Sequence, residues 1–576
     1  MLRPEYPRPQ LRRDLWQNLN GEWEYSTDRM DSGMDRGLMN PEAVFEERIN
    51  VPFCRESSLS GIGDKEFCNC VWYRKKISIP AEWAGKRILL HIGACDFFTT
   101  LWVDGKKVGD HRGGFSSFSF ELTPYLTENE ATLTLRAFDD IRSGNQAGGK
   151  QSKKHGSFGC FYTRTTGIWQ TVWLEAVEES YITELKYYPD IDAKALTIHA
   201  AAEKADGMIL SAKAFYEGKT VGEVSCTVHG RAAVATLSLS ELHLWECGAG
   251  RLYDLELTLG NDKVTSYFGM RNVGVNEGIF YLNGKPVFQR LVLDQGFYPD
   301  GIFTAPSEEA LLGDIERSLA MGFNGARLHQ KIFEPRFLYH CDRLGYLVWG
   351  EHGNWGLDIS KPEAYKAFLP EWLEAIKRDF NHPSIIGWCP LNETQPDQDT
   401  EFVRFLAEMT RAYDPTRLYI EASGYCHVPG IADMVDLHDY SGRELLEERY
   451  GALYRGEDVK VYIPRRWKIE EYGRPTFISE YGGIYWNPAF EQDENKCENW
   501  GYGKGPATKE EFFERFLSQT EFFLFNPHMG ALCYTQLTDV EQEQNGLYTF
   551  DRKAKFDPSL FRAILTQKAA IETDEI

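Results

Sequence analysis

Two glutamates each stand at the end of a short apolar segment of the chain. Glu393 ends the segment that begins at Ser384, and Glu480 ends the segment that begins at Pro475. A buried strand that stops at a carboxylate holds that charge at the rim of a sheet. Two carboxylates that meet in one pocket can act as an acid/base and a nucleophile. The sequence therefore offers a candidate catalytic pair, provided that the fold brings the two segments together.

Helices and strands alternate in the part of the chain that carries both glutamates. Ser307 can cap a helix that runs to Gly322, and Gly345 ends a second helix; further helices are expected at 372–380 and 402–413. This alternation, from residue 276 onward, predicts a parallel sheet. The length fits a (β/α)₈ barrel, whose active site lies at the C-terminal ends of its strands. A doubly wound sheet is the alternative, but no Gly-x-Gly-x-x-Gly motif opens the first unit.

The chain before residue 276 has the pattern of β-sandwiches. Short alternating or aromatic-rich runs are separated by turn residues, and Asp104-Gly105 indicates a tight hairpin. We predict a β-sandwich at 1–179, an immunoglobulin-like sandwich at 180–275 and a barrel at 276–576. A Gly/Lys/Ser-rich loop at 143–159 fits either a mobile surface loop or a lid over another domain's site.

Composition and charge exclude several classes of protein. The net charge of −23 argues against binding to nucleic acids or anionic membranes. No apolar segment resembles a secretory signal or a membrane-spanning helix. The 12 cysteines are scattered, and Cys68-Asn-Cys70 has no second pair nearby that would complete a zinc site. We expect a cytoplasmic protein with free thiols that requires no cofactor and no metal.

Polar residues fall where the strands of the predicted barrel end. Any one of them could be a solvated loop residue, but seven or more strands that end this way are hard to explain by chance. We therefore expect them to surround a single pocket. They are Asp294, Arg327, His329, Glu351, Asn392, Glu393, Glu421, His438, Tyr440, Glu480, Gln536 and Asp539.

The segments around the two glutamates resemble those of glycoside hydrolase family 2. The stretch from His382 to Glu393 is similar to the acid/base signature of that family, in which Asn precedes the catalytic Glu. Phe477-Ile-Ser-Glu480-Tyr-Gly is similar to its nucleophile segment. Trp102-Val-Asp-Gly-Lys106 and Thr166-Gly-Ile-Trp169 resemble parts of its sugar-binding domain, so that the resemblance covers nearly the whole chain. It implies that the sandwich at 1–179 is a jelly roll of this sugar-binding type and that 276–576 is the catalytic barrel.

The resemblance implies a retaining exo-β-glycosidase. Glu393 would protonate the leaving oxygen and later activate water, while Glu480 would attack the anomeric carbon, with carboxyl groups about 5–5.5 Å apart. Asn392 would bind the sugar 2-hydroxyl, Tyr440 would orient the nucleophile, and Arg327 would help to keep it ionised. If these residues instead have purely structural roles, Asn392 would cap the following helix and the two glutamates would form buried ion pairs at the rim of the barrel.

The residues that would choose the sugar differ from better-known family members. The Asn-x-Lys pattern with which β-glucuronidases of the family bind the sugar carboxylate is absent, since the matching stretch reads Glu543-Gln-Asn545-Gly. Lys331, or Arg465 and Arg466, could bind a carboxylate instead; the alternative for all three is surface charge or an ion pair. The last strand carries Thr535 where many members have Trp, so stacking is expected to move to Trp355 or Trp486.

The sequence predicts a galacto-configured substrate, either a β-galactoside or a β-galacturonide. Two alternative functions within the same family are those of a β-glucuronidase and of an α-L-arabinosidase. A third alternative is a carbohydrate-binding protein without catalytic turnover. The expected partner is a small carbohydrate or glycoconjugate, and the resemblance suggests a homodimer or homotetramer. The predicted substrate-binding residues are Asp294, Arg327, His329, Lys331, Glu351, Trp355, Asn392, His438, Tyr440, Trp486 and Gln536.

Overall fold

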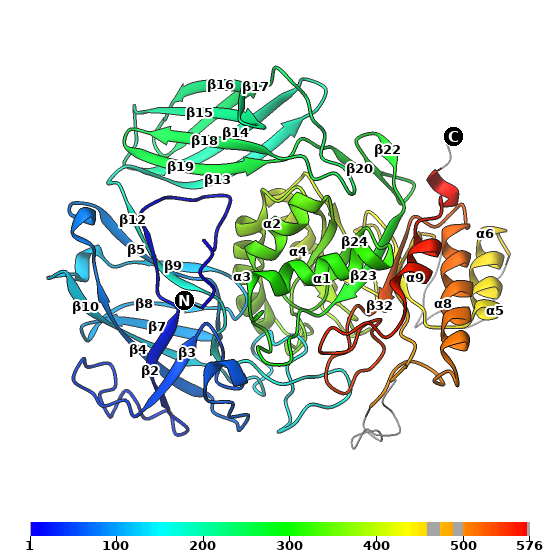
Figure 1. Cartoon of the computed structure of the whole chain (residues 1–576), viewed down its shortest axis with the longest axis horizontal. Helices are drawn as coiled ribbons and strands as arrows, with labels where there is room; N and C mark the ends of the chain where they lie inside the picture. Colours follow the sequence, from blue (N-terminus) through cyan, green and yellow to red (C-terminus); the bar gives the residue numbers. More distant parts are fainter. Residues whose placement is uncertain (1, 458–472, 488–498, 573–576) are drawn as a thin grey trace.

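The computed structural model describes residues 2–457, 473–487 and 499–572. In Figure 1, an N-terminal β domain in blue and cyan and a second β domain in green lie beside the C-terminal part, which runs from green to red. Two β-sandwiches therefore precede a barrel, which confirms the fold class expected from the sequence. Along the described part of the chain, no helix has both the length and the apolar character needed to cross a membrane.

The N-terminal domain is built from two main antiparallel sheets. Aromatic and aliphatic residues such as Trp23, Tyr73 and Leu135 fill the space between the sheets. One sheet has the strand order β1 (Trp16–Asn18), β12 (Val172–Val177), β5 (Arg87–Ile92), β9 (Phe118–Glu121). The other has the order β3 (Glu47–Val51), β2 (Gly21–Thr27), β4 (Cys70–Ser78), β10 (Glu130–Phe138), β7 (Phe98–Val103), β8 (Lys106–Arg112). A short pair, β6 (Cys95–Asp96) and β11 (Gly167–Ile168), adjoins them.

The second domain is a smaller sandwich with alternating inward and outward side chains. In β17 (Ala232–Ser238), every second residue is buried, which is typical of a sheet with one solvent-facing side. Its sheets have the orders β13 (Tyr181–Asp190), β14 (Ala195–Glu203), β17 (Ala232–Ser238) and β16 (Lys219–Thr227), β15 (Ile209–Tyr216), β18 (Tyr253–Leu259), β19 (Asp262–Phe268). A small sheet, β20 (Val273–Asn276), β21 (Ile279–Leu282) and β22 (Lys285–Pro286), leads into the barrel.

Eight parallel strands form the barrel sheet. Several of these strands are buried along their whole length, as parallel strands covered by helices should be. The order is β28 (Leu418–Tyr419), β26 (Ile385–Cys389), β25 (Leu347–Glu351), β24 (Gly325–Leu328), β23 (Gln289–Asp294), β32 (Ala531–Thr535), β31 (Phe477–Gly482), β30 (Asp436–His438). A short parallel pair, β27 (Leu391–Asn392) and β29 (Ala422–Ser423), extends the chain beyond β26 and β28.

Helices around the barrel begin and end at residues whose chemistry favours helix ends. Ser307 accepts a hydrogen bond from the Ala310 N–H, and Gly322 takes the left-handed conformation that ends α1. Gly345 ends α2 in the same way, whereas α3 begins at Glu363 rather than near Trp372. Among the described residues, the α-helices are α1 (Glu308–Met321), α2 (Pro335–Leu344), α3 (Glu363–Asp379), α4 (Thr400–Tyr413), α5 (Arg443–Leu446), α6 (Ala452–Tyr454), α8 (Lys509–Leu524) and α9 (Pro558–Leu565).

Candidate active site

Glu480 lies on β31 and is held from two sides. The Arg327 Nη1 donates a hydrogen bond to the Glu480 Oε1 at 2.8 Å, and the Tyr440 hydroxyl donates to the Glu480 Oε2. The guanidinium also donates through Nε to the Glu351 Oε2 at 2.7 Å. Arg327, Glu351 and Glu480 are all buried. The carboxylate of Glu480 is therefore fixed in orientation, as a nucleophile must be.

The charges around Glu480 keep it ionised. Burial by itself would raise the pKa of this carboxyl group, but His438 and Arg327 outweigh it and lower the pKa of Glu480 to about 2. The hydrogen bond from Tyr440 acts in the same direction. Burial raises the pKa of the Tyr440 hydroxyl well above its usual value, so that the hydroxyl keeps the proton that it donates.

Asn392 and Glu393 follow one another where β27 ends. The Asn392 Oδ1 accepts a hydrogen bond from the Arg327 Nη2 at 2.5 Å, while its buried Nδ2 has no hydrogen-bond partner among the described residues. Glu393 has a φ of 49°, which turns its side chain away from the path of the strand. Its N–H donates to the Ser423 carbonyl at 2.8 Å, which fixes this turn.

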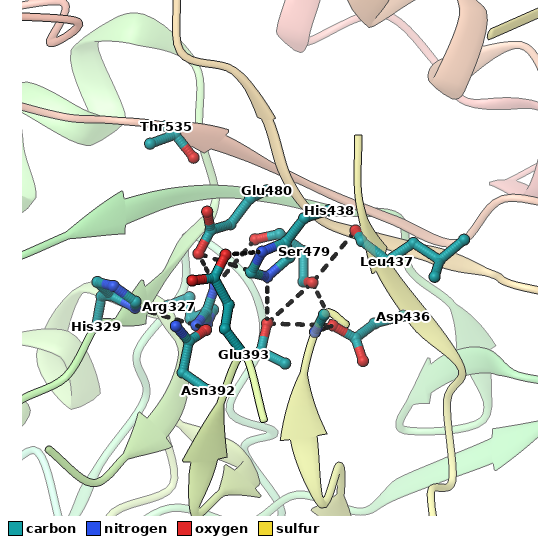
Figure 2. Close-up of polar contacts among 12 residues, drawn as sticks. Arg327, His329, Asn392, Glu393, Asp436, Leu437, His438, Ser479, Glu480 and Thr535 are labelled. Carbon is teal, nitrogen blue, oxygen red and sulfur yellow. Dashed lines mark hydrogen bonds and ion pairs between the residues drawn. The ribbon is translucent and has the colours of Figure 1, made fainter. Parts of the chain in front are cut away.

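His438, at the end of β30, lies beside both glutamates (Figure 2). Its Nδ1 is 3.0 Å from the Glu393 Oε1, and its Nε2 is 3.5 Å from the Glu480 Oε1. One oxygen of each carboxylate and a ring nitrogen of His438 all lie within 4.8 Å of one another. Such a separation suits a carboxylate pair that works by double displacement. Metals also bind such atoms, but the Glu480 oxygens already accept bonds from Arg327 and Tyr440.

Two further predicted residues, His329 and Trp355, contact residues that adjoin this cluster. The His329 Nδ1 lies 3.1 Å from the Glu351 Oε1, and burial lowers the pKa of His329 well below its usual value, which leaves the ring neutral. The Trp355 indole N–H donates to the Asn392 carbonyl at 3.2 Å. Trp355 is therefore the aromatic side chain, of the two expected from the sequence, that contacts the segment of Asn392 and Glu393.

The structure places Lys331 away from the two glutamates. Its ammonium donates to the carbonyls of Gly296 at 2.5 Å and Phe303 at 2.7 Å. Burial lowers the pKa of Lys331 to about 7. Gln330 has a left-handed φ of 53°, so the chain turns there and Lys331 enters an aromatic cluster. The expectation that Lys331 binds a sugar carboxylate is therefore corrected.

Three other predicted residues also have their contacts outside the cluster. The Asp294 carboxylate accepts from the Gly296 N–H, and burial raises the pKa of Asp294 to about 6. The Gln536 amide donates to the Asn545 Oδ1 at 2.7 Å and accepts from Gln295. Trp486 packs against Phe556 with ring centroids 6.2 Å apart. Arg465 and Arg466 lie outside the described residues.

Several residues of the site were not predicted from the sequence. Tyr502 stacks on Tyr440 with ring centroids 3.5 Å apart. The buried Glu543 accepts a hydrogen bond from the Tyr162 hydroxyl of the N-terminal domain. Lys150, in the loop predicted at 143–159, lies with its ammonium 4.1 Å from the centre of the Trp355 ring. The glycines and lysines of that loop were its only signal in the sequence.

Comparison with known proteins identifies the family of this chain. Residues 16–144 match the sugar-binding domain of glycosyl hydrolases family 2, and residues 273–555 match the TIM barrel domain of the same family. The chain belongs to glycoside hydrolase family 2. It is a glycosidase, as the family's chemistry requires.

Relatives in this family carry two kinds of name. A β-glucuronidase of Sus scrofa is 23% identical over 84% of this chain and 79% of its own length. A β-glucuronidase of Paenibacillus borealis is 22% identical over 97% of this chain and 98% of its own. A β-galactosidase of Thermoanaerobacter pseudethanolicus is 24% identical over 69% and 54%. The solved β-glucuronidase of Ruminococcus gnavus in complex with D-glucuronic acid has a TM-score of 0.79 at 19% identity, over 98% of this chain and 100% of that one.

Proposed function

We propose that this family 2 enzyme is a retaining exo-β-glycosidase in which Glu480 is the nucleophile and Glu393 the acid/base. The observation that carries the proposal is the cluster of one oxygen from each carboxylate and a His438 nitrogen within 4.8 Å. An inverting enzyme needs a wider gap between its carboxyl groups, because a water molecule must fit between base and sugar. The pKa of Glu480, about 2, keeps this residue ionised at neutral pH, as the residue that attacks as a carboxylate must be.

The reaction would proceed in two displacements. In the first, a Glu480 oxygen attacks the anomeric carbon, the glycosidic C–O bond breaks, and the leaving oxygen takes the proton of Glu393. In the second, Glu393 removes a proton from water, which attacks the anomeric carbon and releases Glu480 as a carboxylate. The sugar leaves with its original anomeric configuration.

Asn392 is suited to bind the 2-hydroxyl of the sugar. Its Oδ1 is occupied by Arg327, whereas its Nδ2 is buried and unpaired within the described structure. A buried amide hydrogen without a partner is costly, and a substrate hydroxyl would remove that cost. The bond would strengthen as positive charge develops on the sugar ring in the transition state.

The substrate that we propose is a β-glucuronide. The sequence favoured a galacto-configured sugar. Most relatives reported above are named β-glucuronidases, however, and these names agree better with the β-glucuronidase alternative.

The cytoplasmic location and the homo-oligomeric state remain predictions. No disulfide joins the cysteines in the described ranges.

Initial rates on matched nitrophenyl glycosides test this proposal. We expect turnover of the β-glucuronide, no turnover by Glu480→Gln, and a β-anomer as the first product in proton NMR. A first product with α configuration would contradict the double displacement. Undiminished turnover by Glu480→Gln would contradict the assignment of the nucleophile, and turnover of the β-galactoside alone would restore the galacto prediction. Absence of turnover with measurable sugar binding would favour the carbohydrate-binding alternative.

A further inference from the structure

Lys150 is a buried lysine that the N-terminal domain contributes to the mouth of the barrel. Only 7% of its surface is exposed, and its ammonium lies over the Trp355 ring at 4.1 Å from the centroid. Trp355 in turn donates to the carbonyl of Asn392, next to the proposed acid/base. Within the described residues, the Lys150 ammonium has no hydrogen bond and no ion pair. Because a buried charge without a partner is costly, this lysine requires an explanation.

The loop that carries Lys150 is fixed against the barrel. The Gly148 N–H donates to the Trp355 carbonyl at 2.7 Å, and the Gly149 N–H donates to the Gly353 carbonyl at 3.0 Å. The Tyr162 N–H donates to the Lys150 carbonyl at 2.7 Å. In Figure 1, this segment belongs to the cyan chain that leaves the N-terminal domain below the barrel. The loop is thus bound to the barrel beside the proposed site, which supports the second of the two alternatives for it.

Other residues of the barrel secure the far part of the same loop. The Gln542 side chain donates to the carbonyls of Gly159 at 2.6 Å and Phe161 at 3.1 Å. The Trp500 indole donates to the Gly159 carbonyl at 2.6 Å. The position of Lys150 is thus set by backbone contacts on both sides of it, and it is not a surface side chain that happens to fold inward.

The groups that Lys150 faces are acidic. Burial lowers the pKa of its ammonium, but Cys160, Glu543, Glu393 and Glu480 outweigh this effect and raise the pKa. Lys150 therefore keeps its charge at neutral pH. Glu480 already accepts from Arg327 and Tyr440, and Glu543 from Tyr162 and Asn545. The three N–H bonds of the ammonium stay available for a ligand.

The other buried cations around the strand ends are already used by the protein. Arg327 binds Glu351, Glu480 and Asn392. The Lys555 ammonium lies 2.7 Å from the Asp539 Oδ1 and also donates to the Trp486 carbonyl. Lys331 donates to two carbonyls, as described above. Among these cations, Lys150 has N–H groups that donate to no protein atom in the described structure, and it lies beside the proposed catalytic pair.

We propose that Lys150 binds the C6 carboxylate of a β-linked uronide and so selects uronides over neutral sugars. The proposal rests on the glycosidase function described above and names the residue that recognises the acid group. A pocket with three nearby carboxylates would repel an anionic sugar, and one charged ammonium inside it offsets that repulsion and gives the carboxylate a partner. The N-terminal domain would then determine which sugars the barrel accepts.

The test compares Lys150→Met with the matched variant Lys153→Met. Lys153 lies in the same loop but is exposed, and methionine keeps the apolar length of the side chain without its charge. Rates are measured on nitrophenyl β-glucuronide, β-galacturonide, β-glucoside and β-galactoside. We expect Lys150→Met to lower kcat/KM for the uronides by about 30-fold or more, and for any neutral substrate by less than about threefold. Lys153→Met should match the wild type.

Binding of free sugars provides a measurement that does not depend on turnover. In calorimetric titrations, wild-type protein should bind D-glucuronate or D-galacturonate more tightly than the neutral hexoses, and Lys150→Met should lose that preference. Equal losses on uronides and neutral sugars, or an unchanged preference for uronates, would overturn the role of Lys150. Binding of uronate without turnover would instead count against the glycosidase function and leave Lys150 supported.

Discussion

The Arg327 guanidinium and the Glu480 carboxylate form a buried ion pair with 2.8 Å between Nη1 and Oε1. The same guanidinium lies 2.7 Å from the Glu351 Oε2. Arg327 therefore neutralises two carboxylates from strands that are not adjacent in the barrel sheet, since Glu351 lies on β25 and Glu480 on β31. It also keeps the proposed nucleophile ionised, so its position links the stability of the barrel to the proposed chemistry.

Replacing Arg327 should affect both properties. Arg327→Met leaves Glu351 and Glu480 buried without their cation, a change that typically costs about 3–5 kcal/mol. We expect a lower melting temperature of the barrel transition in calorimetry, and a loss of kcat of about 1,000-fold on an aryl glycoside. Arg112→Met is a suitable control, because Arg112 is an exposed arginine of the N-terminal domain. A stable Arg327→Met variant with normal kcat would contradict this account.

Removal of the proposed acid/base should depend on the leaving group. Glu393→Gln cannot protonate the departing oxygen, and general acid catalysis typically contributes about 10²–10⁴-fold. We expect a large loss of kcat/KM for an alkyl or simple phenyl glycoside, and a much smaller one for a dinitrophenyl glycoside, whose leaving group needs no proton. Glu480→Gln is the control and should lose activity on both. Equal losses in Glu393→Gln would argue against the role of Glu393.

His427 should stabilise the barrel at low pH and not at high pH. Its Nδ1 lies 3.0 Å from the Glu421 Oε1. Although burial lowers the pKa of His427, Glu421 and Asp436 raise it to about 9. Because the folded pKa exceeds the unfolded value of about 6.5, the stabilisation is complete below that pH and disappears as the pH rises through about 9. It amounts to at most about 3 kcal/mol.

Calorimetry at several pH values can measure this contribution. The melting temperature of His427→Gln should lie well below that of the wild type at pH 6, and the difference should shrink as the pH approaches 9.5. His229→Gln, which replaces an exposed histidine, should show no such trend. A difference between His427→Gln and wild type that is the same at every pH would indicate packing alone.

Two glycines of the loop provide a matched test of how the loop is positioned. Gly149 has a φ of 57°, and a Cβ there would lie 2.3 Å from the Gln330 carbonyl oxygen. Gly144 has a φ of 75°, but a Cβ there would meet nothing within 4 Å. Alanine strains the backbone at both positions, yet only Gly149→Ala should displace the loop. We expect kcat/KM on an aryl glycoside to fall about tenfold or more in Gly149→Ala and less than about twofold in Gly144→Ala.

The fold and part of the site could be predicted because their signals are local. Ser307 and Gly322 mark the ends of α1 through backbone chemistry that depends on a few neighbouring residues. Glu393 and Glu480 lie in segments with recognisable neighbours, and parallel strands bring their ends to one side of the sheet. Such signals require no knowledge of how distant segments pack.

The selectivity region of the site could not be predicted, because it depends on such packing. Lys331 follows Arg327 by four positions, but the left-handed Gln330 turns the chain before it. The sequence contains no sign of that turn. Lys150 precedes the barrel by more than a hundred residues, and its location depends on contacts between loop and barrel backbones that no local sequence pattern reveals.

The hydrogen bond from Tyr162 to Glu543 joins the N-terminal sandwich to the loop after the last barrel strand. Together with the Gln542 and Trp500 contacts, it joins two units of the chain, the N-terminal domain and the barrel, next to the proposed site. The loop that carries Lys150 therefore reaches that site only when the two units are in contact. During refolding, activity should return only when the two units dock, later than the native secondary structure of the barrel.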